Sequence, residues 1–179
     1  MTINDNDIIK TLNASRETGF RMLLSKYQEP LYWHIRRLVV SHDDAQDATQ
    51  ETFVRIFLSL EQFRGDSSLR TWLYRIATNE ALRLIGKRRQ ETISLDSVTT
   101  GVDIIASDNY VDYADKLAVK LQKAILTLPP KQQLAFNLRY YDELAFDEIA
   151  RIADSTPSSI KASYHVAKEK IVKYMNSND

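Results

Sequence analysis

Apolar residues recur every three or four positions between Phe20 and Leu38, which is the spacing of an amphipathic helix. Only 4 of the 179 residues are glycine and 4 are proline. A β-sandwich or barrel needs glycine at many tight turns, so this scarcity argues against those folds. The sequence therefore predicts an all-α protein whose first long helix is bent at Pro30.

Composition excludes several kinds of site. The chain has no cysteine, which rules out disulfides, thiolate metal sites and a cysteine nucleophile. Its three histidines, His34, His42 and His165, are scattered and form no metal-binding or catalytic motif. We therefore expect no metal, no cofactor, no small-molecule substrate and no catalytic residue, in a protein that is not an enzyme. The polar N-terminus and the short apolar runs predict a cytoplasmic protein without a signal peptide or a membrane span.

Charge is distributed unevenly along a chain whose formal net charge is zero. Residues 64–90 carry seven basic and two acidic side chains, whereas residues 91–115 carry six acidic side chains and neither lysine nor arginine. Residues 116–179 are again basic, with ten basic side chains against seven acidic. No helical period runs through the acidic stretch. We predict two small helical domains, 1–90 and 116–179, joined by an acidic linker over 91–115.

Within the first domain, Ser41 or Asp43 is expected to cap a second helix. The residues predicted to face inward from that helix are Ala45, Ala48, Thr52, Phe53, Ile56 and Leu60. A turn over 65–68 should supply the N-cap of the next helix. That helix is expected to bury Leu69, Trp72, Leu73, Ile76 and Ala77.

The second domain is expected to begin with a helix over 115–127 and to continue with one that starts at Pro130. The residues predicted to face inward from the first of these, or just after it, are Leu117, Leu121, Ala124, Ile125 and Leu128. For the following helix they are Leu134, Ala135, Leu138 and Tyr141, and for a short helix over 147–153 they are Ile149, Ala150 and Ile152.

A helix-turn-helix is predicted where the short helix is followed by a turn at Asp154 and a sharp helix start at Thr156-Pro157. Asp tolerates the left-handed conformation that such a turn uses. The buried stripe of the second helix is predicted to be Ile160, Tyr164, Ala167 and Ile171. A polar, basic face suited to DNA carries Ser158, Lys161, His165 and Lys168. An ordinary helical hairpin with a solvated outer face remains the alternative at this point.

Three segments resemble a known family. Residues 44–53 (DAQDATQETF), residues 63–79 (FRGDSSLRTWLYRIATN) and the run from Phe146 to His165 are similar, in order and spacing, to the extracytoplasmic-function (ECF) group of bacterial RNA polymerase sigma factors. The resemblance covers about residues 18–90 and 115–175. It implies a protein that binds core RNA polymerase, through its β′ and β subunits, and directs promoter recognition, DNA melting and transcription initiation.

By position, the resemblance implies roles for individual residues. The polymerase-binding residues would be Asp44, Asp47, Gln50 and Glu51. The residues that open the minus-ten element and hold an unpaired base would be Arg64, Tyr74, Arg75, Asn79 and Arg83. The helix-turn-helix would read the minus-thirty-five element through Ser158, Ser159, Lys161, Ser163, His165 and Lys168.

The chain departs from the family pattern at three of these places. Ser163 stands where an arginine is common, Asp154 where the turn often has glycine, and Arg83 where an acidic residue is frequent. Many relatives are held inactive by an anti-sigma factor, and the sequence leaves open whether this chain has such a partner.

Two other functions would each account for part of the sequence. A stand-alone helix-turn-helix transcriptional regulator would explain residues 130–173 but not residues 63–79, and the zero net charge disfavours it. An all-α enzyme would have to use the scattered histidines.

Overall fold

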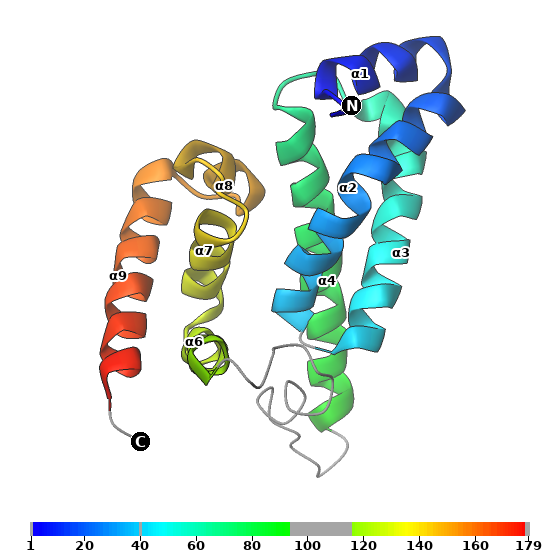
Figure 1. Cartoon of the computed structure of the whole chain (residues 1–179). Coiled ribbons are helices and arrows are strands. Elements are labelled where there is room, and N and C mark those ends of the chain that lie inside the picture. The colour runs from blue at the N-terminus through cyan, green and yellow to red at the C-terminus, as the bar shows by residue number, and fades with distance from the viewer. Residues whose placement is uncertain (1, 40, 94–115, 178–179) are drawn as a thin grey trace.

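The computed structural model describes residues 2–39, 41–93 and 116–177, and the described chain forms two groups of α-helices without a strand among them (Figure 1). The predicted all-α, two-domain architecture is confirmed. The predicted linker lies outside the described residues except at its first three positions, 91–93, which continue a helix. No helix in the described ranges is both long enough and apolar enough to cross a lipid bilayer.

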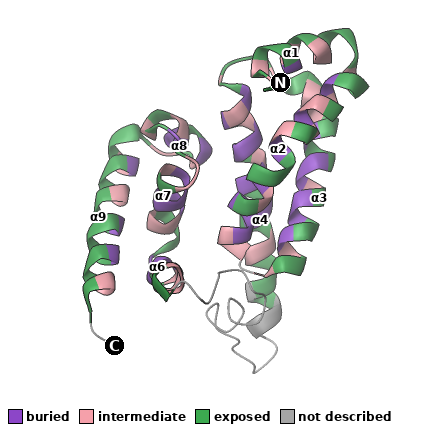
Figure 2. Ribbon diagram, in the orientation of Figure 1, coloured by how far each residue is buried: buried purple, intermediate pink, exposed green. Residues whose placement is uncertain are grey.

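The first domain contains α1 (Asp5–Ala14), α2 (Arg16–Val39), α3 (His42–Ser59), a short 3-10 turn (Leu60–Gln62) and α4 (Leu69–Ile93). In Figure 1, α2, α3 and α4 run side by side and α1 crosses one end of them. Figure 2 shows buried positions alternating with exposed ones along these helices, as expected where each helix has one inner face. Helix α2 continues through Pro30.

Helix α1 was not predicted, although its start carries ordinary signals. The Asn4 side chain accepts a hydrogen bond from the Asn6 N–H at 3.0 Å and so caps the helix. Ile8 is fully buried. The Asp5 carboxylate accepts hydrogen bonds from the Tyr27 hydroxyl at 2.8 Å and from Lys26 Nζ at 2.6 Å, which fastens α1 to α2.

The predicted inner faces of α3 and α4 agree with the structure. Ser41 is the N-cap of α3, and its side chain accepts a hydrogen bond from the Asp44 N–H. Five of the six residues predicted to face inward from this helix are buried, and the sixth, Leu60, is partly buried. Ser68 Oγ accepts from the Thr71 N–H at 3.1 Å and caps α4. Leu69, Leu73 and Ala77 are buried, while Trp72 is partly buried and packs on Phe63. The outer face of each of these two helices, opposite its buried face, therefore remains available for partners.

The second domain contains α6 (Lys116–Leu126), α7 (Pro130–Tyr140), α8 (Phe146–Ile152) and α9 (Pro157–Asn176). The predicted inner residues of α7 and α8 are buried apart from Tyr141, which is intermediate. The prediction for Leu117 is wrong, because this side chain is 70 % exposed. It lies in the first turn of α6, whereas the buried residues of this helix, Ala124 and Ile125, lie near its end.

Helices α8 and α9 form the predicted helix-turn-helix. Asp154 has φ +49° and so adopts the left-handed conformation expected of it. Thr156 caps α9 by accepting from the Ser159 N–H at 3.2 Å, and Pro157 is the first helical residue. The predicted stripe packs inward, with three of its residues buried and Tyr164 partly buried.

The two domains pack against each other. Helix α4 contacts α8, and α2 contacts α7. One continuous cluster of buried apolar side chains extends from α1 to the start of α9. A smaller cluster belongs to the second domain alone and consists of Ala124, Ile125, Leu128, Phe136, Ala167 and Ile171.

Candidate docking and nucleic-acid surfaces

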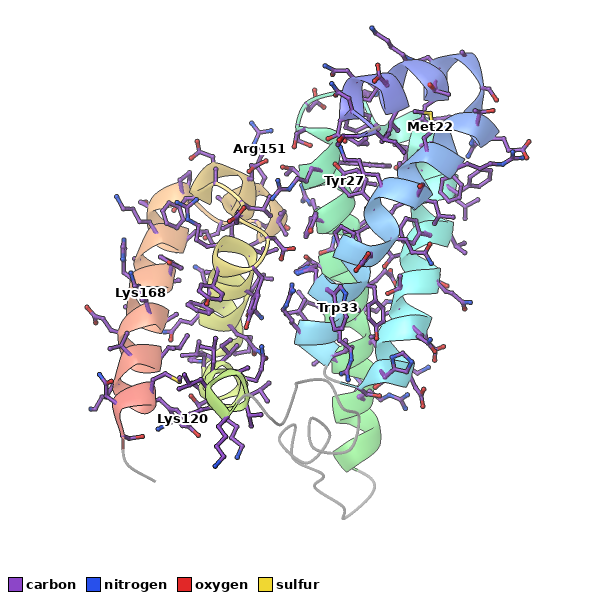
Figure 3. The ribbon with its side chains drawn as sticks, in the orientation of Figure 1. Met22, Tyr27, Trp33, Lys120, Arg151 and Lys168 are labelled. Carbon is purple, nitrogen blue, oxygen red and sulfur yellow. The ribbon has the colours of Figure 1, made fainter. Side chains whose placement is uncertain are left out.

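A groove of about 1340 Å³ runs between α2 and α3 on the outside of the first domain. Large apolar side chains line it while remaining in contact with solvent: Trp33 (38 % exposed), Phe57 (37 %), Val54 (53 %) and Leu58 (68 %). Trp33 is labelled on α2 in Figure 3. A cluster of exposed aromatic and aliphatic side chains on a small domain is typical of a protein-docking surface.

The four residues predicted to bind polymerase do not share one environment. Asp47 and Gln50 are exposed and line the groove. Asp44 instead forms an ion pair with Arg88 on α4 at 2.6 Å, and Glu51 pairs with Arg55 one turn away at 3.4 Å. The groove therefore combines an apolar floor with one acidic and one amide side chain from the predicted set.

Sequence reasoning missed the apolar part of this surface, although a signal was present. Val54, Phe57 and Leu58 lie outside the inward period of α3 that runs through Thr52, Phe53 and Ile56. Three large apolar residues on the outward side of an amphipathic helix indicate a second buried face, to be covered by a partner.

A buried carboxylate links α3 to α4. Glu80 is 4 % exposed and forms ion pairs with Arg55 of α3 and with Arg83 of α4, the latter at 3.0 Å. Burial of a carboxylate is favourable only with such partners. Arg83, predicted to contact DNA, is thus held against Glu80 while part of its side chain remains exposed.

The residues predicted for promoter melting extend from the loop before α4 to the middle of that helix. Arg64 and Asn79 are exposed, and Arg75, Asn79 and Arg83 lie at i, i+4 and i+8 on one side of α4. Arg75 forms an ion pair with Asp154 of the helix-turn-helix at 2.7 Å. Gly65, at φ +79°, makes the turn that returns the loop to α4.

Tyr74 differs from the rest of this set because it is buried in the described conformation. It is 3 % exposed, and its hydroxyl donates a hydrogen bond to Asp142 Oδ1 at 2.7 Å. Its ring lies 5.2 Å from that of His34. Burial, together with the negative charge of Asp142, raises the pKa of the Tyr74 hydroxyl. No face of this ring is free for a base while the two domains are in contact.

Asp142 is the polar centre of the inter-domain contact, and no sequence signal marked it. It lies in the loop between α7 and α8, where its side chain is 8 % exposed. Its carboxylate is 3.6 Å from Arg37 and 3.9 Å from His34, and its backbone carbonyl accepts from Arg70. Burial raises the pKa of the Asp142 carboxyl, an effect that its hydrogen bond from Tyr74 and its arginine neighbours oppose.

His34 is fully buried between α2 and α4. Its Nε2 lies 2.7 Å from Thr78 Oγ1, which joins α2 to α4. Burial, with the nearby positive charge of Arg37, lowers the pKa of His34 from 6.5 to about 3. In the described parts of the chain, no cluster of three or more His, Asp or Glu side chains is arranged to hold a metal ion.

The predicted DNA face of α9 is largely open. Ser158, Lys161, His165 and Lys168 are exposed, while Ser159 and Ser163 are partly covered. Ser159 Oγ accepts a hydrogen bond from Lys131 at 2.7 Å. Lys168 lies on α9, the helix farthest from the first domain in Figure 3. The chemistry of this face is that of cations and hydroxyls, which suits phosphate and base-edge contacts.

Comparison with known sequences and structures agrees with this arrangement. Residues 23–91 match the family model Sigma-70 region 2, and residues 118–171 match Sigma-70, region 4. The two matches together cover more than half of the chain, which belongs to the sigma-70 family of bacterial RNA polymerase sigma factors. Sigma factors bind core RNA polymerase and direct it to promoters, and they are not themselves catalytic enzymes.

Curated relatives indicate the group of sigma factors within this family. The RNA polymerase sigma-H factor of Pseudomonas aeruginosa is 26% identical over 178 residues, which is 94% of this chain and 92% of that protein. The ECF RNA polymerase sigma-E factor of Escherichia coli K12 is 28% identical over 183 residues, covering 94% of this chain and 93% of that protein. The chain is accordingly an ECF-type sigma factor with a promoter-directing function. A stand-alone helix-turn-helix regulator is not favoured, because it leaves the region 2 match unexplained.

Two solved structures share the fold. The sigma factor RpoE from Bartonella quintana, in complex with the anti-sigma factor NepR, has a TM-score of 0.74 at 23% identity and covers 89% of this chain and 98% of that one. CnrH, in complex with the cytosolic domain of CnrY, has a TM-score of 0.73 at 15% identity and covers 98% of this chain and 99% of that one.

Proposed function

We propose that residues 1–90 dock on core RNA polymerase and open the minus-ten element, that residues 116–179 read the minus-thirty-five element, and that residues 91–115 connect the two activities. The protein would act in the cytoplasm, where the polymerase and the DNA are, and entirely by binding, without a catalytic step of its own. The observation that carries the proposal is the groove between α2 and α3, because it offers polymerase an apolar surface with an acidic edge.

The docking proposal assigns two kinds of contact to the groove. Trp33, Val54 and Phe57 would provide apolar area that a partner removes from water, at about 25 cal/mol per Å². Asp47 would lie opposite a basic group of the partner. This charge pair would determine the orientation in which the two proteins dock more than it would raise their affinity. Asp44 and Glu51 would act indirectly, because their ion pairs hold α3 against α4 and stabilise the local helix.

The docking test replaces one acidic and one apolar side chain of the groove with lysine. Asp47→Lys with Val54→Lys places positive charge where we propose that a basic partner surface lies, and both side chains are exposed in the free protein. We expect loss of co-purification with core polymerase, by more than tenfold in affinity, while the melting temperature stays close to that of the wild type.

The matched control makes the same chemical changes on the second domain. Glu143→Lys with Val172→Lys also reverses one acid and converts one exposed valine, which is 49 % exposed. This control should bind core polymerase normally. Wild-type affinity in the groove variant would show that the groove is only a solvated face and would end the docking proposal.

Strand opening is assigned to the α4 face that carries Arg75 and Asn79, with Arg64 in the preceding loop and Tyr74 and Arg83 nearby. Arginine guanidinium planes and amide groups suit unpaired bases, which offer both a stacking face and hydrogen-bonding edges. Asn79→Ala should reduce the permanganate reactivity of promoter thymines in holoenzyme, whereas Gln90→Ala, another exposed amide on α4, should not. Normal opening by the Asn79 variant would remove that residue from the proposed site.

An anti-sigma factor is a further proposed partner, supported by the fold shared with the RpoE–NepR complex. A protein that covered the groove between α2 and α3 would compete with core polymerase for Trp33 and Phe57. Such competition would hold the sigma factor inactive without changing its fold.

A further inference from the structure

Helix α9 contains no arginine, although arginine makes the commonest specific contact in the major groove, a bidentate hydrogen bond to guanine. Its predicted DNA face offers serine, lysine and histidine side chains instead. A preference for particular bases must therefore come from these smaller or less rigid groups and from any charge placed beside them.

One positive charge reaches this face from outside the helix-turn-helix. Lys131 lies in the first turn of α7, and α7 packs against α9 (Figure 1). The Lys131 Nζ donates a hydrogen bond to Ser159 Oγ at 2.7 Å, across 28 positions of the chain. Ser159 is the third residue of α9 and is partly exposed, next to the exposed Ser158. The contact therefore brings an ammonium group to the N-terminal end of the predicted DNA face.

No acidic side chain neutralises this ammonium group. Among the ion pairs formed within the described ranges, none includes Lys131, whereas Lys26, for example, pairs with Asp5 at 2.6 Å. Water screens the charge of Lys131 in the free protein, because the residue is exposed. DNA that covered this edge would displace part of that water, and the charge would then act more strongly on the base nearest Ser159.

The hydrogen bond also determines what the Ser159 hydroxyl can do. A lysine ammonium only donates, so Ser159 Oγ is the acceptor and its single proton is left for another group. The backbone N–H of Ser159 is already used, because it donates to Thr156 Oγ1 at 3.2 Å. Ser159 thus offers DNA a hydroxyl donor with a positive charge directly behind it.

A donor placed beside a positive charge discriminates between two classes of base. In the major groove, guanine and thymine present keto oxygens, whereas adenine and cytosine present amino groups, which are donors. A keto oxygen would accept from the hydroxyl and would be attracted by the ammonium group. An amino group would meet a second donor and a charge of the same sign as its own hydrogens.

We propose that Lys131 is a specificity-determining residue outside the helix-turn-helix: through Ser159, it makes the second domain prefer guanine or thymine to adenine or cytosine at one position of the minus-thirty-five element. This role rests on the proposed function, in which residues 116–179 read that element. It differs from the role of Lys161 and Lys168, which bind DNA regardless of base sequence in the same proposal.

Base preference can be measured with the holoenzyme. Each position of the minus-thirty-five element is varied through all four base pairs, and each promoter competes with one fluorescent reference promoter. Lys131→Gln removes the positive charge but keeps a long polar side chain. The wild type should prefer keto to amino bases by about fivefold or more at one position, and Lys131→Gln should lower that ratio to about twofold or less.

The same change in a Ser159→Ala background shows whether the two residues act together. Without the hydroxyl, Lys131→Gln should alter the base preference much less than it does in the wild type. Equal effects in the two backgrounds would mean that the lysine acts without Ser159 and would overturn the inference.

The matched control removes the other lysine hydrogen bond between α7 and α9. Lys170 Nζ donates to Gln132 Oε1 at 3.0 Å, about three turns further along α9 than Ser159. Lys170→Gln makes the same chemical change and should leave the base preference as it is in the wild type. Both lysines are exposed, so the melting temperature of each variant should stay close to that of the wild type.

Three results would overturn the specificity role of Lys131. One is an unchanged keto preference in Lys131→Gln, and another is a selective wild-type profile that has no keto-preferring position. The third is an equal loss of affinity for all promoters with a smaller salt dependence, since Lys131 would then contact phosphate only. Failure of the proposed function would look different: the wild-type holoenzyme would bind all variants of the element equally, and Lys161→Ala would leave the salt dependence unchanged.

Discussion

A methyl group added at Gly19 should loosen the N-terminal helix, because α1 crosses α2 at this point. An ideal Cβ on Gly19 would lie 2.5 Å from the Leu12 backbone nitrogen and 2.6 Å from its Cα. Non-bonded carbon contacts are comfortable at about 3.5–4.0 Å, so α1 would have to move away by about 1 Å. Backbone atoms cannot rotate aside as a side-chain end can.

The magnitude follows from what α1 contributes. Overpacking of this kind is unfavourable by about 1–3 kcal/mol. Ile8, the fully buried residue of α1, would lose part of a further ~2 kcal/mol of apolar burial. Alanine offsets about 1 kcal/mol through its higher helix propensity. We expect Gly19→Ala to lower the free energy of unfolding by about 2–3 kcal/mol.

Gly86 provides the matched control on α4. A Cβ at Gly86 would have no neighbour within 4 Å, so Gly86→Ala should instead stabilise the protein by about 0.5–1 kcal/mol. Urea unfolding followed by tryptophan fluorescence is a suitable assay, since both tryptophans of the chain, Trp33 and Trp72, lie in the first domain. At ~1–3 kcal/mol per M, the Gly19 variant should unfold at about 1–2 M less urea. Equal or greater stability of the Gly19 variant would refute the close crossing of α1 over α2.

Three further predictions concern other parts of the structure. Folding lowers the pKa of His34 from 6.5 to about 3, so the free energy of unfolding should fall as the pH drops below 6.5. Between pH 7 and 5, the wild type should lose about 2 kcal/mol more of this free energy than His34→Asn in the same urea assay. Equal losses in the two proteins would contradict this prediction. Thr156→Ala removes the cap of α9 and should lower stability by about 1 kcal/mol in thermal melts followed by circular dichroism; an unchanged melt would contradict the cap. If α9 lies in the major groove, Lys161→Ala and Lys168→Ala should each weaken promoter binding by holoenzyme regardless of base sequence and reduce its salt dependence, whereas Lys173→Ala should do so less; unchanged salt slopes would place α9 elsewhere.

Local structure was predictable where short-range rules decide it. The inward period of α3, the Ser68 cap and the left-handed Asp154 each depend on neighbours within about four residues, and all were anticipated. Helix α1 was missed because its ten residues carry few apolar positions. Besides the buried Ile8, the contacts of Asp5 with Lys26 and Tyr27 on α2 hold it in place.

The inter-domain contact was not predictable, because it joins residues far apart in the chain. Tyr74 and Asp142 are separated by 68 positions, and their meeting depends on how two complete domains pack. Nothing in a helical period distinguishes a tyrosine that a neighbouring domain covers from one that faces solvent. For the same reason, the sequence indicated Arg75 as a DNA contact without indicating Asp154 as its partner in the free protein.

The shared apolar cluster links the stability of the second domain to its contact with the first. Buried side chains of α8, such as Ile149 and Ile152, belong to the cluster that extends into the first domain, whereas α6 and the later turns of α9 rely on the smaller cluster. Separation of the two domains would leave α8 with fewer buried neighbours, and its backbone amides would then exchange with deuterated solvent faster than those of α3. Amide exchange along α8 would therefore report domain separation in the unlabelled, unmodified protein.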